Sequence, residues 1–252
     1  MSGHSKWSTI KHKKAATDAK KGAVFTKLAR DVTIATREGG GGDPAMNFRL
    51  RLIMDKARAA NMPAENVDRA IKKGLGIGSD GITFEEITYE GYSPGGAAIM
   101  LKALTDNRNR TASDVRAAFS RGGGNLGELG SVAWNFESKA VVNVDGIDDE
   151  KAEELALAAI DVGAEDFKAE DGSLEVSGPP ESLQPITELV KEQGLEPSNA
   201  VITMVPKTLM ALDSSTATQT LRLLDRMDEL DDIQEVFTNA DFPDEALDSY
   251  DG

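Results

Sequence analysis

The spacing of hydrophobic residues predicts three helices in the first third of the chain. Hydrophobic side chains from Val24 to Ala35 recur at intervals of four, four and three, which predicts a helix over residues 17–38. The glycines Gly39–Gly42 interrupt this pattern, and similar spacings predict a second helix over 45–60 and a third over 63–74. Three amphipathic helices joined by short loops are expected to form a small bundle.

The second of these helices is expected to have one apolar and one basic face. The side chains predicted to be buried are Phe48, Leu52, Ile53 and Ala57. The side chains predicted to be exposed are Arg49, Arg51, Lys56 and Arg58. The basic character of the N-terminal region is therefore expected to continue onto the bundle surface.

Beyond residue 81 the pattern becomes that of strands. Residues 82–90 are rich in Thr, Ile, Phe and Tyr and predict a strand, and a hairpin-type connection leads to a second strand over 97–105. A helix over 111–120 follows, and the glycine-rich residues 122–130 then predict a loop. A third strand is expected over 131–136.

Residues 140–206 contain a complete set of elements of their own. Their pattern predicts strand, helix, strand, strand, helix and strand, which is the ferredoxin-like order. The flanking stretches together supply four strands and two helices, but neither flank alone closes a covered sheet. We therefore predict that 140–206 is inserted into a discontinuous domain made of 81–139 and 207–241.

The predicted fold class is multidomain α+β, with an N-terminal three-helix bundle and two ferredoxin-like α/β sandwich domains, one inserted into the other. Residues from 239 onward are acidic, and we expect this end of the chain to fray. The predicted parts are a basic flexible arm (1–21), a helical domain (22–80), the discontinuous domain (81–139 and 207–241), the inserted domain (140–206) and an acidic tail (242–252).

Composition places the chain among ordinary globular proteins. Hydrophobic residues make up 40% of the sequence, which is enough for buried cores. The absence of cysteine excludes disulfides and thiolate metal sites and fits a reducing compartment. No apolar run approaches the length of a membrane span, and the basic N-terminus lacks the apolar segment of a secretion signal. We therefore expect a cytoplasmic protein.

The net charge changes sign along the chain. Residues 1–80 carry 16 lysines and arginines against 8 acids, whereas residues 81–252 carry 12 against 35, and the formal net charge is −15. The basic excess begins in Ser2–Arg30, which also contains Trp7. This asymmetry indicates a polyanionic partner, with lysines neutralising phosphates and Trp7 stacking on an unpaired base. The alternative is a basic terminus that is merely solvated.

Catalytic and cofactor motifs are weak in this sequence. Gly76–Gly81 and Gly122–Gly127 match the glycine pattern of dinucleotide-binding loops, but both follow a predicted helix and precede a strand. This order is the reverse of the one that places a pyrophosphate on a helix N-terminus. The sequence has no Gly-Lys-Ser or Gly-Lys-Thr, which excludes a Walker-type phosphate loop.

The remaining candidates for chemistry are histidines and acid clusters. His4 and His12 lie in the predicted flexible arm, where a catalytic geometry is hard to maintain. The acids of 145–150 and 165–171 lack calcium-loop spacing and are interpreted as acidic surface. We therefore expect no enzymatic activity, no cofactor and no metal site.

A second basic cluster lies within the acidic part of the chain, at Arg108, Arg110, Arg116 and Arg121. Arg108 and Arg110 are in the predicted loop before the helix. They are either ion partners of neighbouring acids or a second phosphate contact, and the sequence leaves both interpretations open. Trp134 falls in a predicted strand and is expected in the core.

Taken together, these residues resemble the YebC/PmpR family, which includes the mitochondrial translational activator of cytochrome oxidase subunit one. The resemblance covers nearly the whole chain and begins directly after Met1, so we expect a bacterial cytosolic member without a presequence. The matching motifs are Gly3-His-Ser-Lys-Trp7, Lys13-Lys14-Ala15, Asp18-Ala-Lys20, Phe25-Thr-Lys27, Gly42-Asp-Pro44, Asn47 with Arg49-Leu-Arg51, Asn61-Met-Pro63, Tyr89-Glu-Gly-Tyr92, Asp106-Asn-Arg-Asn-Arg-Thr111 and Gly122-Gly-Gly-Asn-Leu-Gly127.

The resemblance implies a helical N-terminal domain followed by two α/β domains. It also implies two different functions, because family members are regarded as DNA-binding transcriptional regulators and also as ribosome-associated translation factors that help at proline-rich stretches. The family offers no catalytic residues to transfer to this sequence.

Physical arguments favour RNA over promoter DNA. Sequence-specific reading of DNA needs a rigid element that offers side chains to base edges, and the third predicted helix offers only Arg69, Lys72 and Lys73. An arm of lysines with a tryptophan suits a structured RNA, where phosphates and unstacked bases are recognised. The acidic part of the chain would be repelled by a long duplex.

The sequence therefore predicts a non-enzymatic nucleic-acid-binding regulator of gene expression that contacts ribosomal RNA, with a DNA-binding transcriptional regulator as the alternative and a protein-interaction scaffold as a second alternative. Ribosomal proteins are possible further partners, and neither a membrane nor a small-molecule substrate is expected. The predicted contact residues are Lys6, Trp7, Lys11, His12, Lys13, Lys14, Lys20, Lys21, Lys27, Arg30, Arg108 and Arg110.

Overall fold

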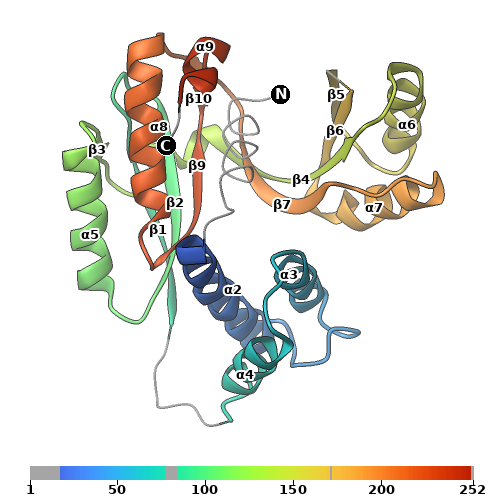
Figure 1. The fold of residues 1–252 in the computed structure, drawn as a ribbon, viewed down its shortest axis with the longest axis horizontal. Coiled ribbons are helices and arrows are strands. Elements are labelled where there is room, and N and C mark those ends of the chain that lie inside the picture. The colour runs from blue at the N-terminus through green and yellow to red at the C-terminus, as the bar shows by residue number, and fades with distance from the viewer. Residues whose placement is uncertain (1–17, 78–83, 171, 251–252) are drawn as a thin grey trace. The chain divides into compact units, whose positions relative to one another are not determined.

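The computed structural model describes residues 18–77, 84–170 and 172–250. These residues form two compact units. Residues 134–209 make up the inserted unit, and the described residues before and after them make up the split unit (Figure 1). None of the helices in the described ranges is long and apolar enough to cross a membrane. The mixed α+β, multidomain fold is confirmed, while the finer division into arm, domains and tail stays a prediction.

Three helices at the start of the split unit form a bundle, as the periodicity predicted. They are α2 (Asp18–Glu38), α3 (Phe48–Ala59) and α4 (Ala64–Gly74), and α2 contacts both of the others. Figure 1 shows them in blue to cyan. Their core consists of Leu28, Val32, Ala35, Leu50, Ala57, Met62, Val67 and Ala70.

Asn47 fixes the connection between α2 and α3. Its side chain is buried and donates Nδ2 hydrogen bonds to the carbonyls of Ala35 (2.8 Å) and Gly41 (2.9 Å). Its Oδ1 accepts from the backbone N–H of Leu50 (3.0 Å), so Asn47 is also the N-cap of α3. Helix α3 therefore starts at residue 48 rather than near 45.

The expected buried position of Phe48 is wrong. Leu50 and Ala57 are the buried residues of α3, with Ile53 and Met54 packed beside them, whereas Phe48 is 36% exposed. The cap at Asn47 places Leu50 towards α2, and residues at three- and four-residue intervals from Leu50 share that face. Phe48, the first residue of the helix, lies outside this face.

The split unit contains a four-stranded antiparallel sheet. Its strands are β1 (Glu85–Tyr92), β2 (Ala98–Thr105), β3 (Asn125–Leu126) and β9 (Ile233–Thr238), in the order β3-β1-β2-β9. The strand β9 pairs with β2, with Ala103 opposite Ile233, although the whole inserted unit separates them in sequence.

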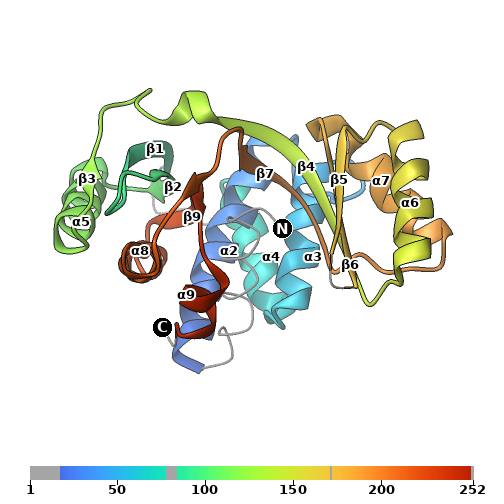
Figure 2. The same ribbon diagram turned by 90° about the horizontal axis from the view of Figure 1, so that it is seen from above.

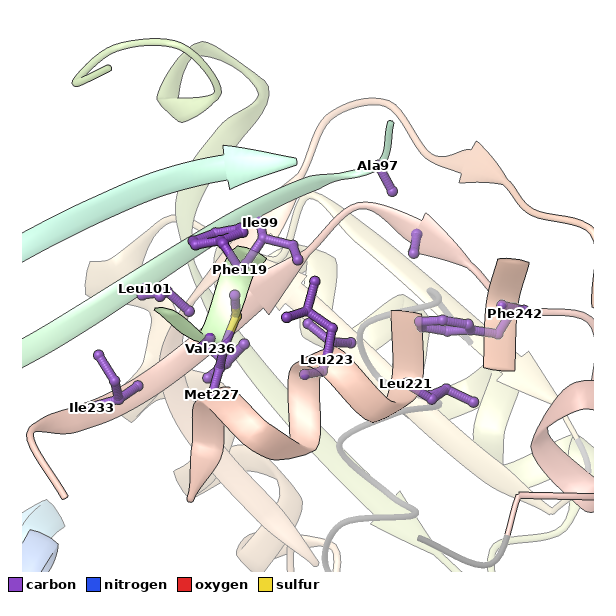
Figure 3. Packing of buried hydrophobic residues seen from close by; sticks show 14 of the residues in the cluster. Ala97, Ile99, Leu101, Phe119, Leu221, Leu223, Met227, Ile233, Val236 and Phe242 are labelled. Carbon is purple, nitrogen blue, oxygen red and sulfur yellow. The ribbon is translucent and has the colours of Figure 1, made fainter. Parts of the chain in front are cut away.

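Helices α5 (Arg108–Arg121) and α8 (Ser214–Asp228) cover one face of this sheet. Phe119 of α5 and Leu223 of α8 are fully buried together with Ile99 and Leu101 of β2. Figure 3 shows these side chains interleaved in one cluster. Burial of such side chains contributes about 1.5–3 kcal/mol each, so this cluster strongly stabilises the split unit.

Residues 240–250 form regular elements and are packed, which corrects the expectation that this stretch frays. Residues Ala240–Asp241 (β10) pair in parallel with Met210–Ala211 (β8), and a short helix α9 (Asp244–Asp248) follows. Phe242 and Tyr250 are both buried members of the cluster, in which Figure 3 labels Phe242. The prediction relied on the acidic composition of this segment and overlooked these two aromatic side chains, which supply the apolar surface for packing.

The inserted unit has the predicted order of elements. Its sheet order is β5-β6-β4-β7 with antiparallel neighbours, the arrangement of ferredoxin-like folds (Figure 2). Leu174, Ile186 and Val190 are among its fully buried residues. The elements are β4 (Phe136–Asp145), α6 (Asp149–Asp161), β5 (Asp166–Glu170), β6 (Ser173–Gly178), the 3₁₀ helix η2 (Pro180–Ser182), α7 (Leu183–Glu192) and β7 (Asn199–Pro206).

The predicted strand over 131–136 is wrong, and so is the core position of Trp134. Trp134 lies in a 3₁₀ helix, η1 (Ala133–Asn135), and is 68% exposed. The backbone N–H groups before and at the start of η1 form hydrogen bonds with a side chain and not with a neighbouring strand. Three of them donate to the buried carboxylate of Glu90. These come from Gly130 (2.7 Å to Oε1), Val132 (2.7 Å to Oε2) and Ala133 (2.8 Å to Oε2).

We predict that Glu90→Gln lowers the free energy of unfolding by about 2–4 kcal/mol, because an amide offers one acceptor oxygen where three N–H groups now meet a carboxylate. Urea unfolding followed by circular dichroism measures the change as a lower midpoint with an unchanged slope. Glu128→Gln, an exposed change in the same loop, is the control and is expected to shift stability by less than about 0.5 kcal/mol. Equal effects of the two changes would contradict the anchoring role of Glu90.

Candidate nucleic-acid interface

Most of the predicted contact residues cannot be placed. Those outside the described residues are Lys6, Trp7, Lys11, His12, Lys13 and Lys14. Lys20 and Lys21 lie on α2, where the structure describes the backbone but not these side chains. The remaining four residues belong to the split unit and have defined surroundings.

Lys27 and Arg30 of α2 face acids of the same chain. The Lys27 ammonium donates to the carbonyl oxygen of Asp228 and lies 3.3 Å from its Oδ1. The Arg30 guanidinium donates to the carbonyl of Asp231 and to Oδ1 of Asp232 (3.2 Å). Both cations therefore bind the turn between α8 and β9, and their contact with nucleic acid stays a prediction.

Asp232 is the centre of a buried polar network. Its Oδ2 accepts hydrogen bonds from Arg110 Nη2 (2.8 Å), Thr111 Oγ1 (2.8 Å) and Thr105 Oγ1 (3.2 Å), and its Oδ1 accepts from Arg30. Burial by itself raises the pKa of Asp232, but the hydrogen bonds from Arg110 and Thr111 outweigh it and hold the pKa below its ordinary value. The carboxylate is therefore charged at neutral pH and binds its partners as an anion.

The two arginines left open between ion pairing and phosphate contact differ in their surroundings. Arg110 binds Asp106 (2.8 Å) as well as Asp232, which favours ion pairing for this residue. Arg108, the first residue of α5, lies 3.7 Å from Glu85, and both side chains are mostly exposed. Such a surface pair contributes little to stability, so the guanidinium of Arg108 stays accessible to a ligand.

Sequence reasoning missed the role of Asp232. It is one of five acids in residues 225–232, and nothing in its local pattern separates it from the others. Its importance arises from contact with Arg110, which is 122 residues away in sequence. The Asp106–Thr111 motif was a signal for a special role, but it did not identify the acid that this motif binds.

The surface of the bundle also carries an aromatic side chain beside a free cation. The guanidinium of Arg51 lies 5.4 Å from the centre of the Phe48 ring, and no carboxylate of the described residues lies within 4 Å of it. Met46, two residues before Phe48 in sequence, is 82% exposed. Such a surface can stack an unpaired base and neutralise a phosphate.

The glycine-rich loop after α5 is not a phosphate cradle. The N–H groups of Gly122, Gly123 and Gly124 donate to carbonyls at the end of α5, and that of Gly127 donates to the carbonyl of Glu90. A Cβ at Gly122 would lie 2.4 Å from Leu223, so close packing requires this glycine. Within the described ranges, no group of three or more histidine or acidic side chains is placed to hold a metal ion.

Asp31 of α2 has an unusual electrostatic position. Burial and the nearby carboxylate of Glu235 raise its pKa to about 7, while Lys56 and Arg49 partly offset this rise. Glu86 also raises it slightly. Because Asp31 lies among groups from α3, β1 and β9, its protonation reports on the contact between the bundle and the sheet.

We predict that Asp31→Asn removes a pH dependence of stability. The folded chain holds the Asp31 proton up to about pH 7, whereas the unfolded chain releases it near the ordinary pKa of 3.8, so this group makes stability fall as pH rises from 4 to 7. Compared with the natural protein, the variant should gain up to about 4 kcal/mol at pH 8 and nothing at pH 4. Thermal unfolding at several pH values tests this, with the exposed change Asp55→Asn as control. A gain that is the same at pH 4 and pH 8 would show that Asp31 ionises normally.

Comparisons with known proteins agree with the motifs. Residues 5–77 match the family model described as TACO1/YebC protein N-terminal domain, and residues 84–240 match the model described as TACO1/YebC second and third domain. Proteins of Chloroflexus aggregans (50% identical) and Moorella thermoacetica (49% identical) match over the full length of both chains. One of Geotalea uraniireducens is 49% identical over 98% of this chain and 99% of its own. All three are named probable transcriptional regulatory protein.

A solved structure supports the same assignment. The crystal structure of a conserved hypothetical protein from Aquifex aeolicus has a TM-score of 0.82 and 44% sequence identity. The match covers 93% of this chain and 96% of the other. Sequence motifs, family models and fold therefore lead to one conclusion, and the chain belongs to the TACO1/YebC family.

Proposed function

We propose that this protein is a non-enzymatic regulator of gene expression whose basic N-terminal part contacts ribosomal RNA. In this role it acts as a cytoplasmic translation factor that eases stalls at proline-rich stretches, which is one of the two functions that the family resemblance implies. The observation that carries the proposal is the division of charge, with 16 basic against 8 acidic residues in 1–80 and 12 against 35 in 81–252.

The charge division restricts how the protein can approach a polyanion. Phosphates attract the first 80 residues and are repelled by most of the remaining chain. A long duplex would meet both parts, whereas a defined RNA pocket can receive the basic part alone. Basic ribosomal proteins are suitable partners for the acidic part.

The described surface of the bundle suits unpaired bases better than a DNA groove. In α4, Arg69 pairs with Glu65, and the ammonium of Lys73 lies 5.0 Å from the centre of the Phe84 ring. Helix α4 thus offers to base edges only Lys72 and Arg69, the latter in an exposed ion pair, which is too little for sequence-specific reading. The exposed pair of Phe48 and Arg51 offers stacking and charge, which single-stranded RNA uses.

Two alternatives make different use of the same features. A transcriptional regulator at promoters agrees with the names of the curated relatives and would use the same lysines on DNA phosphates. A protein-interaction scaffold would depend on the α+β units and would keep its function after deletion of residues 2–21.

We predict that the protein co-sediments with ribosomes in a salt-sensitive manner and that Lys13→Glu/Lys14→Glu abolishes this. If about six phosphates on single-stranded RNA are neutralised, log K should fall with log salt at a slope of roughly −4. Sedimentation of the tagged protein with ribosomes from growing cells, at low and high salt, measures both effects.

The matched control is Lys151→Glu/Lys191→Glu, which makes the same charge change on the inserted unit and should leave ribosome binding intact. If the natural protein stays at the top of the gradient but retards a promoter fragment at physiological salt, the transcriptional alternative is correct. A salt slope near zero would rule out phosphate contacts by the lysines.

A further inference from the structure

Helix α5 carries a concentration of positive charge in the acidic part of the chain. Four of the twelve basic residues of 81–252 lie in its fourteen residues, which contain one acid, Asp114. Arg110 is bound to Asp232, and Arg121 lies in the last turn, where it interacts favourably with the helix dipole. Arg108 and Arg116 have no comparable structural role.

Arg108 and Arg116 each line an open hollow. Arg108 shares the first hollow with Tyr89 and Asn109, among others. Arg116 shares the second with Ser120 and Asn125. Because Arg108, Ala112, Arg116 and Ser120 are spaced four residues apart, they follow one face of α5 and place the hollows in line along it.

Several polar side chains of these hollows are available to a ligand, although Asp106 and Asn107 of the first hollow are bound to Arg110. Among the described residues, no side-chain hydrogen bond is made by Asn109, Ser120 or Asn125, and Arg116 has no carboxylate within 4 Å. Arg108 has only its long, exposed contact with Glu85. A guanidinium beside an amide or hydroxyl group is a combination that binds phosphate oxygens.

We propose that this face of α5 is a second binding site for the phosphate backbone of single-stranded RNA, with Arg108 and Arg116 as its cations. The inference rests on the proposed function and adds a site beyond the basic N-terminal part. Eight residues of helix separate the two arginines by about 12 Å along the axis. A strand of a few nucleotides covers this distance, since each nucleotide advances a duplex strand by about 3.4 Å and an extended strand by more.

The acids near the two hollows favour a single strand over a duplex as the ligand. Asp106 lines the first hollow, where Glu85 also lies near Arg108, and Glu128 lines the second. A duplex would bring many phosphates against these acids, whereas a single strand can place its phosphates at the two guanidinium groups. Tyr89, a lining residue of the first hollow, adds an aromatic ring beside the path of the strand.

The same helix face could alternatively bind an acidic protein segment, because arginine forks also bind carboxylates. The two occupants differ in what else they offer. Only a nucleic acid supplies the stacked bases and regularly spaced phosphates that Tyr89 and the aligned arginines fit. The test therefore includes both kinds of probe.

The experiment measures binding of the full chain to a short fluorescent oligouridine and to an oligo-aspartate of the same length, by fluorescence anisotropy over a range of salt concentrations. Arg108→Glu/Arg116→Glu should weaken oligouridine binding on the order of tenfold. Its slope of log K against log salt should become shallower by about 1.4, or 0.7 for each lost phosphate. Arg108→Lys/Arg116→Lys should keep most of the affinity.

The control is Arg222→Glu/Arg226→Glu, which makes the same charge change at exposed positions of α8 and should leave oligouridine binding unchanged. Equal losses in both double variants would show an effect of net charge and overturn the proposal. Preferential binding of oligo-aspartate that is lost on changing Arg108 and Arg116 would show a protein site and also overturn it.

Failure of this inference can be distinguished from failure of the proposed function. If Lys13→Glu/Lys14→Glu abolishes oligouridine binding while the Arg108 and Arg116 changes have no effect, the α5 site is refuted and the proposed function stands. If the natural protein does not bind oligouridine at low salt but co-sediments with ribosomes, the α5 site is refuted and the proposed function stands; if it does neither, both are refuted. Circular dichroism of each variant confirms that the helix is retained.

Discussion

The carboxylate of Asp232 connects the start of β9 to two parts of the split unit that are distant from it in sequence, the bundle and the segment from β2 to α5. It receives Arg30 from the bundle, Thr105 from the end of β2, and Arg110 and Thr111 from the first turn of α5. A buried charge is tolerated only where such partners replace water. The conformation of the Asp106–Thr111 motif, the start of α5 and the start of β9 therefore depend on one another.

Two other buried polar side chains act in a related way. Asn47 joins the end of α2 to the start of α3, and Glu90 binds the N–H groups that lead into the inserted unit. In each case a side chain satisfies backbone groups that regular structure leaves without partners. Several family motifs therefore contain residues that the fold itself requires. Arg116 and Phe48 have no such structural role.

The number of basic residues differs from the number that can bind a nucleic acid. Lys27, Arg30 and Arg110 are basic, but they bind acids of the same chain, so charge alone overstates the number of cations available to a nucleic acid. Arg51 of α3 and Arg116 of α5 are exposed, and no carboxylate of the described residues lies within 4 Å of either. The proposed RNA contact thus combines the basic N-terminal part with a few exposed arginines, in a protein whose remaining surface is acidic.

Long periodic patterns predicted the fold well. The hydrophobic spacing of α2 and the order of elements in 140–206 needed no tertiary information, because a single face of each element is buried. The errors at Phe48 and Trp134 have a different origin. There, Asn47 and Glu90 set where α3 begins and where β4 begins, and hydrogen bonds between distant residues leave no periodic signal. At the C-terminus, two buried aromatic residues outweighed an acidic composition.

The candidate site was less predictable than the fold. The motifs marked Arg108 and Arg110 equally, and only their partners in space distinguish them. The four-residue spacing from Arg108 to Ser120 was present in the sequence, but its significance depends on Asn125 and Tyr89, which the sheet brings alongside. Exposure and pairing are properties of the folded chain, and residue type does not reveal them.

The pairing of β2 with β9 also determines the order in which the chain can fold during its own synthesis. Ala103 pairs with Ile233, which leaves the ribosome 130 residues later. At about 5–20 residues per second this delay is roughly 6–26 seconds, during which one edge of β2 has no native partner. The inserted unit can pair its own strands during that interval, because β4 and β7 lie within one continuous segment. Completion of the split sheet is therefore among the last events in the maturation of this protein.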